Sequence, residues 1–218
     1  MKDNDIHICI VILRDVVSQY KTPIVTEYAK NERDPFHILI STILSLRTKD
    51  QTTAEASKRL FNVADTPKMM VLLSENEIEK LIYPVGFYRI KAKNIITVCK
   101  TLIEQYNEKV PDEIDTLLKL KGVGRKTANL VVTLGYNKPG ICVDTHVHRI
   151  TNRWGYVNSK TPEATEFALR NKLPSEYWIE INDILVSYGQ NLCLPISPKC
   201  SECKIYSFCD RVGVTKKR

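Results

Sequence analysis

The spacing of apolar residues is helical along almost the whole 218-residue chain, and this restricts the possible fold more than any other feature. Patterns that alternate between apolar and polar residues, as strands do, are scarce; the two best candidates, Val131-Val132 and Val143, lie within helical context. One clear stripe, with intervals of three and four residues, contains Phe36, Leu39, Ile40, Ile43 and Leu44. Such a stripe is the apolar face of an amphipathic helix. We therefore predict an all-α protein of about ten short helices.

Residues that commonly begin helices precede several of these stripes. Asp34-Pro35, Thr66-Pro67 and Thr161-Pro162 each combine a capping side chain with a proline. Proline suits the first helical position because the N–H group it lacks would have no intrahelical acceptor there. Ser74 and Glu77 have the spacing of a capping box. These four sites are predicted helix starts.

Two more helices and the chain end complete the local predictions. The apolar spacing predicts a long helix over residues 89–106. Ser175 is expected to cap another helix, which Gly189 is expected to end. The final Lys216-Lys217-Arg218 is expected to be a frayed, solvated tail.

The charge balance of the chain is basic. Lys and Arg number 32 against 25 Asp and Glu, which gives a net charge of +7 and an isoelectric point near 9.0. This suits a polyanionic partner, although many soluble proteins are as basic without one. The apolar run from Ile6 to Leu13 is too short for a signal peptide or a transmembrane span. We expect a cytoplasmic protein with no membrane partner.

Disulfides are rare in the cytoplasm, so the seven cysteines need another explanation. The spacing C-x6-C-x2-C-x5-C joins four of them: Cys193, Cys200, Cys203 and Cys209. Four thiolates in so short a segment can hold zinc or an iron–sulfur cluster, and the spacing alone does not distinguish the two. The other three are expected to be small core residues: Cys9, Cys99 and Cys142.

A two-glycine turn interrupts the helical pattern near the middle of the chain. The string from Leu118 to Asn129 reads L-K-L-K-G-V-G-R-K-T-A-N, and apolar spacing resumes at Leu130. It predicts helix, hairpin and helix over about residues 116–136. Backbone N–H groups at such a turn can hold a phosphate without reading a base. A plainer interpretation is that Gly122 and Gly124 only end one helix and begin the next.

An aspartate follows the hairpin within the segment V-D-T-H-V-H-R-I, from Val143 to Ile150. Asp144 stands where the N-cap of a helix is expected, and capping alone would explain it. His146 and His148 are two residues apart, which points them to different faces of a helix, so a shared metal is not expected.

Three motifs in this order resemble those of the endonuclease III family of DNA glycosylases: the hairpin string, the aspartate segment and the cysteine spacing. The resemblance runs from about Pro35 to Cys209. It implies two α-helical lobes, one over residues 28–138 with the hairpin. The other would join residues 1–27 to residues 139–218 and carry the cysteine loop.

The resemblance also implies roles for individual residues. Lys126, after the second glycine, would be the nucleophile that attacks the sugar of the damaged nucleotide, and Asp144 would be a second catalytic residue. An amine must be uncharged to attack, a form that burial and a helix N-terminus favour. The four clustered cysteines would hold a [4Fe–4S] cluster. Contacts with DNA are expected from Gly122, Val123, Gly124, Arg125, Thr145, Lys199 and Lys204.

One position departs from the family pattern. The segment from Ile43 to Asp50 resembles the one whose glutamine fills the gap left by the flipped nucleotide, but this chain has Arg47 there. An enzyme that acts on a buried base must extrude it and support the emptied stack. Arginine can do so by stacking and hydrogen bonding, with an altered preference for lesion or opposite base. Otherwise Arg47 is an exposed arginine at a helix end.

By resemblance, the chain is expected to be a monomeric repair enzyme. It would release oxidised pyrimidines from duplex DNA through a Lys126 Schiff base and cleave abasic sites by β-elimination on the 3′ side. One alternative is a mismatch-specific or adenine DNA glycosylase of the same superfamily. Another is a non-catalytic DNA-binding protein whose cluster senses redox state, which would need neither Lys126 nor Asp144.

Overall fold

The structure, a computed structural model, describes residues 1–20, 25–26 and 34–218. Every regular element within these residues is a helix or a helical turn, which confirms the predicted all-α fold. The chain divides into two compact units, one of Met1–Pro23 with Ile141–Arg218 and one of Ile24–Gly140. The boundary expected between residues 27 and 28 lies outside the described residues.

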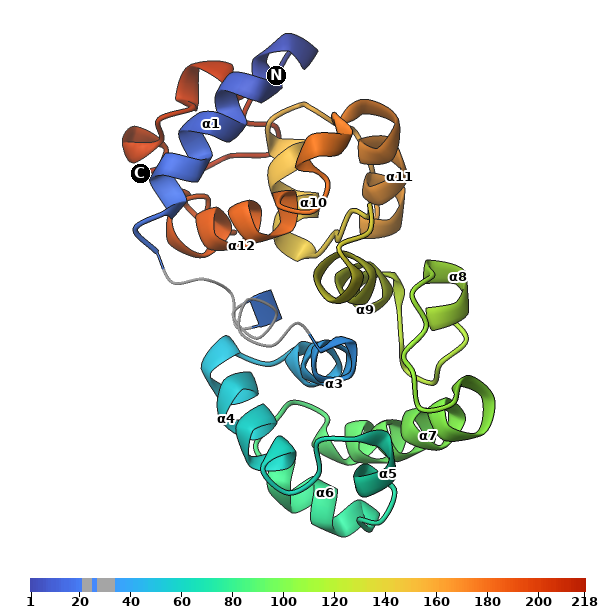
Figure 1. The fold of residues 1–218 in the computed structure, drawn as a ribbon. Coiled ribbons are helices and arrows are strands. Elements are labelled where there is room, and N and C mark those ends of the chain that lie inside the picture. Colours follow the sequence, from blue (N-terminus) through green and yellow to red (C-terminus); the bar gives the residue numbers. More distant parts are fainter. Residues whose placement is uncertain (21–24, 27–33) are drawn as a thin grey trace. The chain divides into compact units, whose positions relative to one another are not determined.

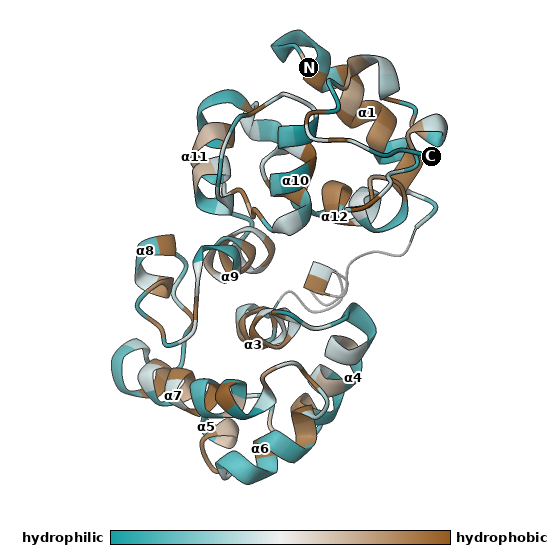
Figure 2. Ribbon diagram, turned by 180° about the vertical axis from the view of Figure 1, so that it is seen from behind, coloured by the Kyte–Doolittle hydropathy of each residue, from teal (hydrophilic) through white to brown (hydrophobic). Residues whose placement is uncertain are grey.

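The unit of Ile24–Gly140 is built around helix α3 (Pro35–Ser45), eight of whose eleven residues are buried. Figure 2 shows α3 mostly brown, the colour of hydrophobic residues. Helices α4, α7 and α9 and turn η2 pack against it. Figure 1 labels the other helices of this unit: α4 (Asp50–Phe61), α5 (Pro67–Met70), α6 (Glu75–Ile82), α7 (Tyr88–Tyr106), α8 (Ile114–Leu117) and α9 (Arg125–Leu130). The π-helical turn η2 (Val131–Gly135) continues α9.

The predicted helix starts are confirmed by their hydrogen bonds. The Asp34 carboxylate accepts the Phe36 N–H at 2.7 Å in front of α3. Ser74 and Glu77 form a reciprocal capping box at the start of α6, with bonds of 3.3 and 2.8 Å. Thr66 and Thr161 cap α5 and α11 (Pro162–Lys172) in the same way. Local sequence therefore determines where these helices begin.

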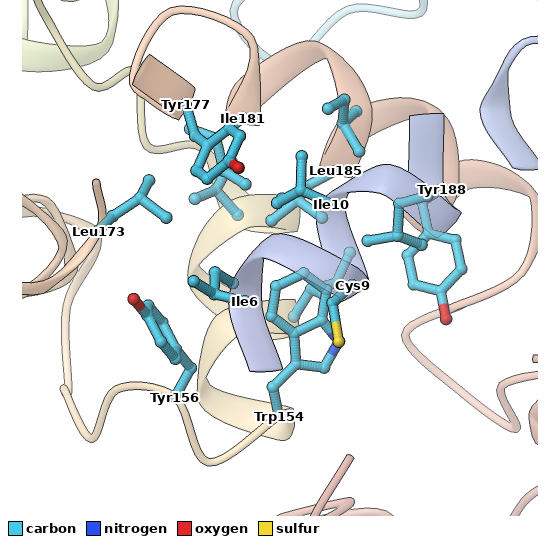
Figure 3. Packing of buried hydrophobic residues seen from close by; sticks show 14 of the residues in the cluster. Ile6, Cys9, Ile10, Trp154, Tyr156, Leu173, Tyr177, Ile181, Leu185 and Tyr188 are labelled. Carbon is cyan, nitrogen blue, oxygen red and sulfur yellow. The ribbon is translucent and has the colours of Figure 1, made fainter. Parts of the chain in front are cut away.

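The other unit contains α1 (Ile6–Val17), α10 (Thr145–Arg153), α11 and α12 (Ile181–Asn191). Helix α12 packs against both α1 and α10, as Figure 1 shows. Its core, drawn in Figure 3, combines the start of the chain with its last third; the labelled members are Ile6, Cys9, Ile10, Trp154, Tyr156, Leu173, Tyr177, Ile181, Leu185 and Tyr188. Cys99 and Cys142 are also buried, which confirms the expectation that all three non-cluster cysteines are core residues.

The helix expected from Ser175 to Gly189 was wrong at both ends. Ser175 begins only a 3-10 turn, Ser175–Tyr177, and α12 starts at Ile181. Gly189 lies inside α12, two residues before its end. A side chain there would collide with the His146 imidazole of α10, so the glycine permits a close helix crossing and does not terminate the helix.

The C-terminal tail is exposed, as expected, but the expectation that it is frayed was wrong. The Arg218 N–H donates to the Pro198 carbonyl at 2.9 Å, and the Arg218 carbonyl accepts the Ser201 N–H at 2.8 Å. Lys217 Nζ donates to the Tyr206 hydroxyl at 2.7 Å. The tail is therefore part of the cysteine loop. Within the described parts of the chain, no helix has both the length and the apolar character that crossing a membrane requires.

Candidate functional site

The two-glycine hairpin connects α8 to α9 and sets Lys126 in the first turn of α9. Gly122 has φ +78°, a backbone conformation that favours glycine. A Cβ on it would also lie 2.5 Å from the side-chain amide nitrogen of Asn94, which would have to shift. Gly124 is the N-cap of α9, and Lys126 is the second residue of that helix. The predicted helix, hairpin and helix are thus present, with the partly exposed Lys126 beside N–H groups that have no intrahelical acceptor.

One residue between the two glycines of the hairpin is buried, whereas the glycines themselves are exposed. Val123 is buried, whereas Gly122 and Gly124 are exposed and Arg125 is intermediate. The Asn129 side chain donates to the Arg125 carbonyl at 3.0 Å and stiffens the first turn of α9. An exposed turn at a helix N-terminus is a suitable place for an anion.

The Arg47 loop follows the C-terminal end of α3. Arg47 is exposed, has φ +53° and places its guanidinium carbon 5.5 Å from the centre of the Phe87 ring. Phe87, itself exposed, has φ +58° and is the N-cap of α7. A positive φ is unfavourable for residues other than glycine, so neighbouring contacts must hold this loop.

Asp144 caps α10, as predicted. Its Oδ1 accepts the N–H groups of His146 at 2.8 Å and Val147 at 2.9 Å. The carboxylate is half-buried and Thr145 beside it is exposed. The segment in front is tied to α12, because the Asn182 side chain donates to the Cys142 carbonyl at 3.2 Å. Asp144 and Lys126 belong to different units, and each is held in its own unit by a helix start.

The two histidines of α10 have separate partners. His148 Nδ1 lies 2.6 Å from the Thr165 hydroxyl, whereas His146 Nδ1 lies 3.1 Å from an Arg149 nitrogen.

Two arginines on α10 hold the start of the cysteine loop. Arg149 donates to the Cys193 carbonyl at 3.0 Å, and burial lowers the pKa of its guanidinium. Arg153 donates to the carbonyls of Leu194 and Pro195, both at 2.6 Å, and approaches the Cys193 sulfur at 3.5 Å. The helix capped by Asp144 is thereby tied directly to the cysteines.

All four clustered cysteines line one cavity, together with Trp154, Tyr188 and Tyr206 among others. The Tyr188 hydroxyl lies 2.9 Å from the Cys203 sulfur. Burial raises the pKa of the Cys193 thiol and raises the pKa of Cys209 to about 11. Metal coordination deprotonates such thiols. Among the described residues, no three Cys, His or carboxylate side chains are grouped so that they could hold one metal ion.

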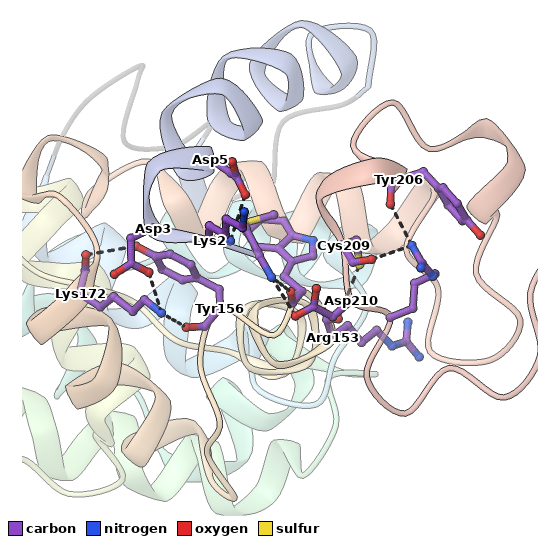
Figure 4. Close-up of polar contacts among 12 residues, drawn as sticks. Lys2, Asp3, Asp5, Arg153, Tyr156, Lys172, Tyr206, Cys209 and Asp210 are labelled. Carbon is purple, nitrogen blue, oxygen red and sulfur yellow. Dashed lines mark hydrogen bonds and ion pairs between the residues drawn. The ribbon is translucent and has the colours of Figure 1, made fainter.

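The remaining candidate residues lie around the cysteine loop. Lys199 is half-buried and lines the cavity, whereas Lys204 is exposed and pairs with Asp15 at 3.1 Å. Figure 4 shows the far end of the loop, where Asp210 follows Cys209. There the Cys209 thiol lies 3.5 Å from the Arg153 carbonyl.

Comparison with known proteins gives these pieces a context. Residues 40–175 match the HhH-GPD superfamily of base excision DNA repair proteins. Endonuclease III of Thermotoga maritima is 45% identical over 197 residues, which cover 89% of this chain and 92% of that protein. Endonuclease III of Escherichia coli K12 is 36% identical over 180 residues, 83% and 85% of the two chains. The chain belongs to the endonuclease III family.

Solved structures of the endonuclease III family show the same fold. A trapped endonuclease III–DNA covalent intermediate, an estranged-adenine complex, matches with a TM-score of 0.87 at 32% identity over 97% of each chain. A non-covalent endonuclease III–DNA complex matches equally well, covering 97% of this chain and 96% of that one. A thermostable thymine-DNA glycosylase shares the fold at a TM-score of 0.74 and 23% identity.

Several residues that support the site were not among those predicted from the sequence. Lys91 is buried beneath the Arg47 loop, and Arg149, Arg153 and Tyr188 surround the cysteines. Lys91 had a detectable signal: it precedes Ile95 by four residues and so lies in register with the apolar stripe of α7. The arginines had no such signal, because their acceptors are backbone carbonyls about forty residues away.

Proposed function

We propose that this chain is a bifunctional base-excision repair enzyme that releases oxidised pyrimidines from duplex DNA and cleaves the strand 3′ to the abasic site. The observation that carries the proposal is Lys126, in the first turn of the helix after a two-glycine hairpin. One structure that this chain matches over 97% of its length is a covalent enzyme–DNA intermediate. Such an intermediate needs a nucleophile, and a lysine amine supplies one.

The proposed chemistry begins at C1′ of the damaged nucleotide. The Lys126 amine forms a bond to C1′ while the glycosidic bond breaks, and the base leaves with a proton. One amine proton then moves to O4′ as the C1′–O4′ bond breaks, which opens the ring and gives an iminium, while the proton that the departing base takes comes from solvent. The iminium acidifies the C2′ hydrogen, and removal of that proton expels the 3′ phosphate. Water then hydrolyses the imine, which frees the lysine and leaves an unsaturated sugar aldehyde.

Asp144 is proposed to support these steps with its negative charge. A carboxylate near C1′ would stabilise the positive charge that develops as the base departs, and it could accept or return protons. Its two backbone hydrogen bonds fix the orientation of the carboxylate before substrate binds. Preorganised charge of this kind costs little reorganisation during the reaction.

The hairpin and the Arg47 loop are proposed to bind the DNA. Residues Gly122 to Arg125 would hold a backbone phosphate at the N-terminus of α9. Arg47 would occupy the space that the extruded nucleotide leaves. Thr145 and Lys199 would contact phosphates. Lys204 could do the same, because its exposed pairing with Asp15 contributes little stability and is readily exchanged.

The four clustered cysteines are proposed to hold a [4Fe–4S] cluster, which when bound would cross-link the loop through four thiolates. A single zinc needs four ligands within about 2.3 Å of one centre. The described residues include no group that fits a lone ion, although four thiols line one cavity. Thiols spread around a cavity suit the separate irons of a cluster.

The proposal is tested with a duplex that contains one abasic site, incubated with the purified holoprotein and borohydride. Borohydride reduces the iminium to a stable amine, so a covalent protein–DNA band is expected for the wild type and none for Lys126→Ala. The matched control is Lys121→Ala, another lysine of the same hairpin, which should retain the band at saturating protein. No band from the wild type would refute the lyase and favour the non-catalytic DNA-binding protein.

Lesion preference requires a second experiment. A panel of duplexes, each with one oxidised pyrimidine, one mismatch or one adenine opposite a damaged purine, measures base release under single-turnover conditions. Fastest release of oxidised pyrimidines is expected. Fastest release from the mismatch or the adenine would instead support the other glycosylases of the superfamily.

A further inference from the structure

A buried lysine lies beneath the Arg47 loop. Lys91, on the inward face of α7, is only 6% exposed. Its Nζ donates to the carbonyls of Leu44 at 2.8 Å and Leu46 at 2.6 Å, and to the Thr48 hydroxyl at 3.3 Å. Three acceptors match the three donors of an ammonium group. Burial lowers the pKa of Lys91 to about 8, which leaves the group mostly charged at neutral pH.

These acceptors surround Arg47 on both sides. The last carbonyls of α3 have no intrahelical donors and carry partial negative charge, so a buried cation there both caps the helix and neutralises its end. The Thr48 hydroxyl also accepts the Gly86 N–H at 3.2 Å. A Cβ on Gly86 would lie 2.5 Å from the Arg47 carbonyl oxygen. Lys91 therefore holds the residues on both sides of Arg47, and Gly86 packs closely against the Arg47 carbonyl. Together these contacts restrict Arg47 to its unfavourable φ.

Core stability alone does not explain a lysine at this position. Burying an ammonium group costs desolvation energy that an apolar side chain of similar volume would avoid. An apolar side chain, however, would provide no donor for the carbonyls of Leu44 and Leu46, and so would not hold the loop backbone. A buried lysine therefore suits a loop whose backbone geometry must be held even at some cost to the stability of the protein.

We propose that Lys91 is a positioning residue that holds Arg47 in its left-handed conformation, and thereby sets how efficiently the enzyme acts on a base that is still paired. The inference rests on the proposed function, in which Arg47 supports the stack after extrusion. Extruding a paired base costs more than engaging an abasic site, which has no base to unstack. Displacing Arg47 should therefore impair base release from a duplex more than cleavage at an abasic site.

The test measures two single-turnover rates on one preparation of holoprotein: release of a paired oxidised pyrimidine and cleavage at a preformed abasic site. Lys91→Met should lower the ratio of the first rate to the second at least roughly tenfold. A protein that merely folds poorly loses both rates in proportion and leaves the ratio unchanged. Lys100→Met is the control: it removes an exposed lysine from the same helix and should keep the wild-type ratio.

Two further variants decide whether Lys91 acts through Arg47. Gly86→Ala displaces the Arg47 carbonyl with Lys91 intact, and it should lower the ratio in the same way. In an Arg47→Ala background, Lys91→Met should lower the ratio no further, since coupled residues are not additive. A wild-type ratio in either single variant, or an undiminished effect of Lys91→Met without Arg47, overturns the inference. If the wild type gives no borohydride adduct, the proposed function itself fails, a result separable from all of these.

Discussion

Replacing Asp144 by Asn and by Ala should separate its structural role from its chemical one. In the structure Oδ1 accepts two backbone N–H groups at the start of α10. Asparagine retains an oxygen at that place and caps helices about as well as aspartate does, whereas alanine has no acceptor. Both variants lack the negative charge that the proposed reaction requires.

The size of each effect follows from these contacts. Loss of an N-cap costs about 0.5–2 kcal/mol of stability, and the upper part of that range applies because two N–H groups lose their acceptor. Asp144→Ala should therefore destabilise the protein by about 1.5–2 kcal/mol, or about 3–8 °C in melting temperature for a chain of this size. Asp144→Asn should stay within about 0.5 kcal/mol of wild type. Base release should fall at least about 100-fold in both variants.

The assay combines thermal unfolding of the holoprotein with single-turnover base release at a temperature where all three proteins are folded. The expected pattern is one variant that is stable and inactive and another that is less stable and equally inactive. Wild-type base release by Asp144→Asn would show that the residue is only a cap. Equal destabilisation by both substitutions would refute the role assigned to the Oδ1 hydrogen bonds.

Three further predictions concern the cysteines and the buried lysine. Cys203→Ala should lower both iron content and melting temperature, because the loop loses one of four cross-links; elemental analysis and calorimetry test this, and full iron content would refute it. Cys9 and Cys99 should resist alkylation in the native protein at neutral pH. Burial raises the pKa of each thiol to about 12, and the thiolate is the reactive form. Rapid labelling of either residue in peptide mass spectra would contradict this. Burial lowers the pKa of Lys91 from 10.5 to about 8. Between these two pH values the unfolded chain binds more protons than the folded chain, so the free energy of unfolding should rise with pH. Relative to Lys91→Met, the rise should be up to about 1.4 kcal/mol per pH unit. Urea titrations across that range measure the difference, which would be constant if the lysine were not desolvated.

Predictions from the sequence succeeded where the determining interaction is local. The Asp34-Pro35 start of α3 and the capping box of Ser74 and Glu77 depend on atoms within three residues of each other, so the pattern is enough. The same is true of Asp144, whose capping role follows from its place before a helical stripe. The hairpin was predictable because its glycines and the helix after it are adjacent in sequence.

Predictions failed where a distant element decides the outcome. Gly189 has the usual signature of a helix end, yet α12 continues through it because α10 packs too closely for a side chain. Arg218 looks like a solvated tail residue, but its backbone pairs with Pro198 and Ser201. Lys91 lies one turn before Ile95 on the apolar face of α7, and only its hydrogen bonds to the end of α3, more than forty residues earlier, explain why a lysine is buried there.

Four residues with proposed roles in the reaction share one structural property: Lys126, Asp144, Arg47 and Lys91 each lie at or against the end of a helix. Lys126 stands at the start of α9, Asp144 at the start of α10, and Arg47 just beyond the end of α3, where Lys91 supplies the missing donors. Helix ends carry the backbone donors and acceptors that the helix itself cannot satisfy, and with them partial charge. Substrate phosphates and charged side chains bind to these groups, whereas stability comes mainly from the apolar helix interiors. Substitutions at these ends should therefore alter the reaction more than the fold, and Asp144→Asn against Asp144→Ala is the sharpest test of that separation.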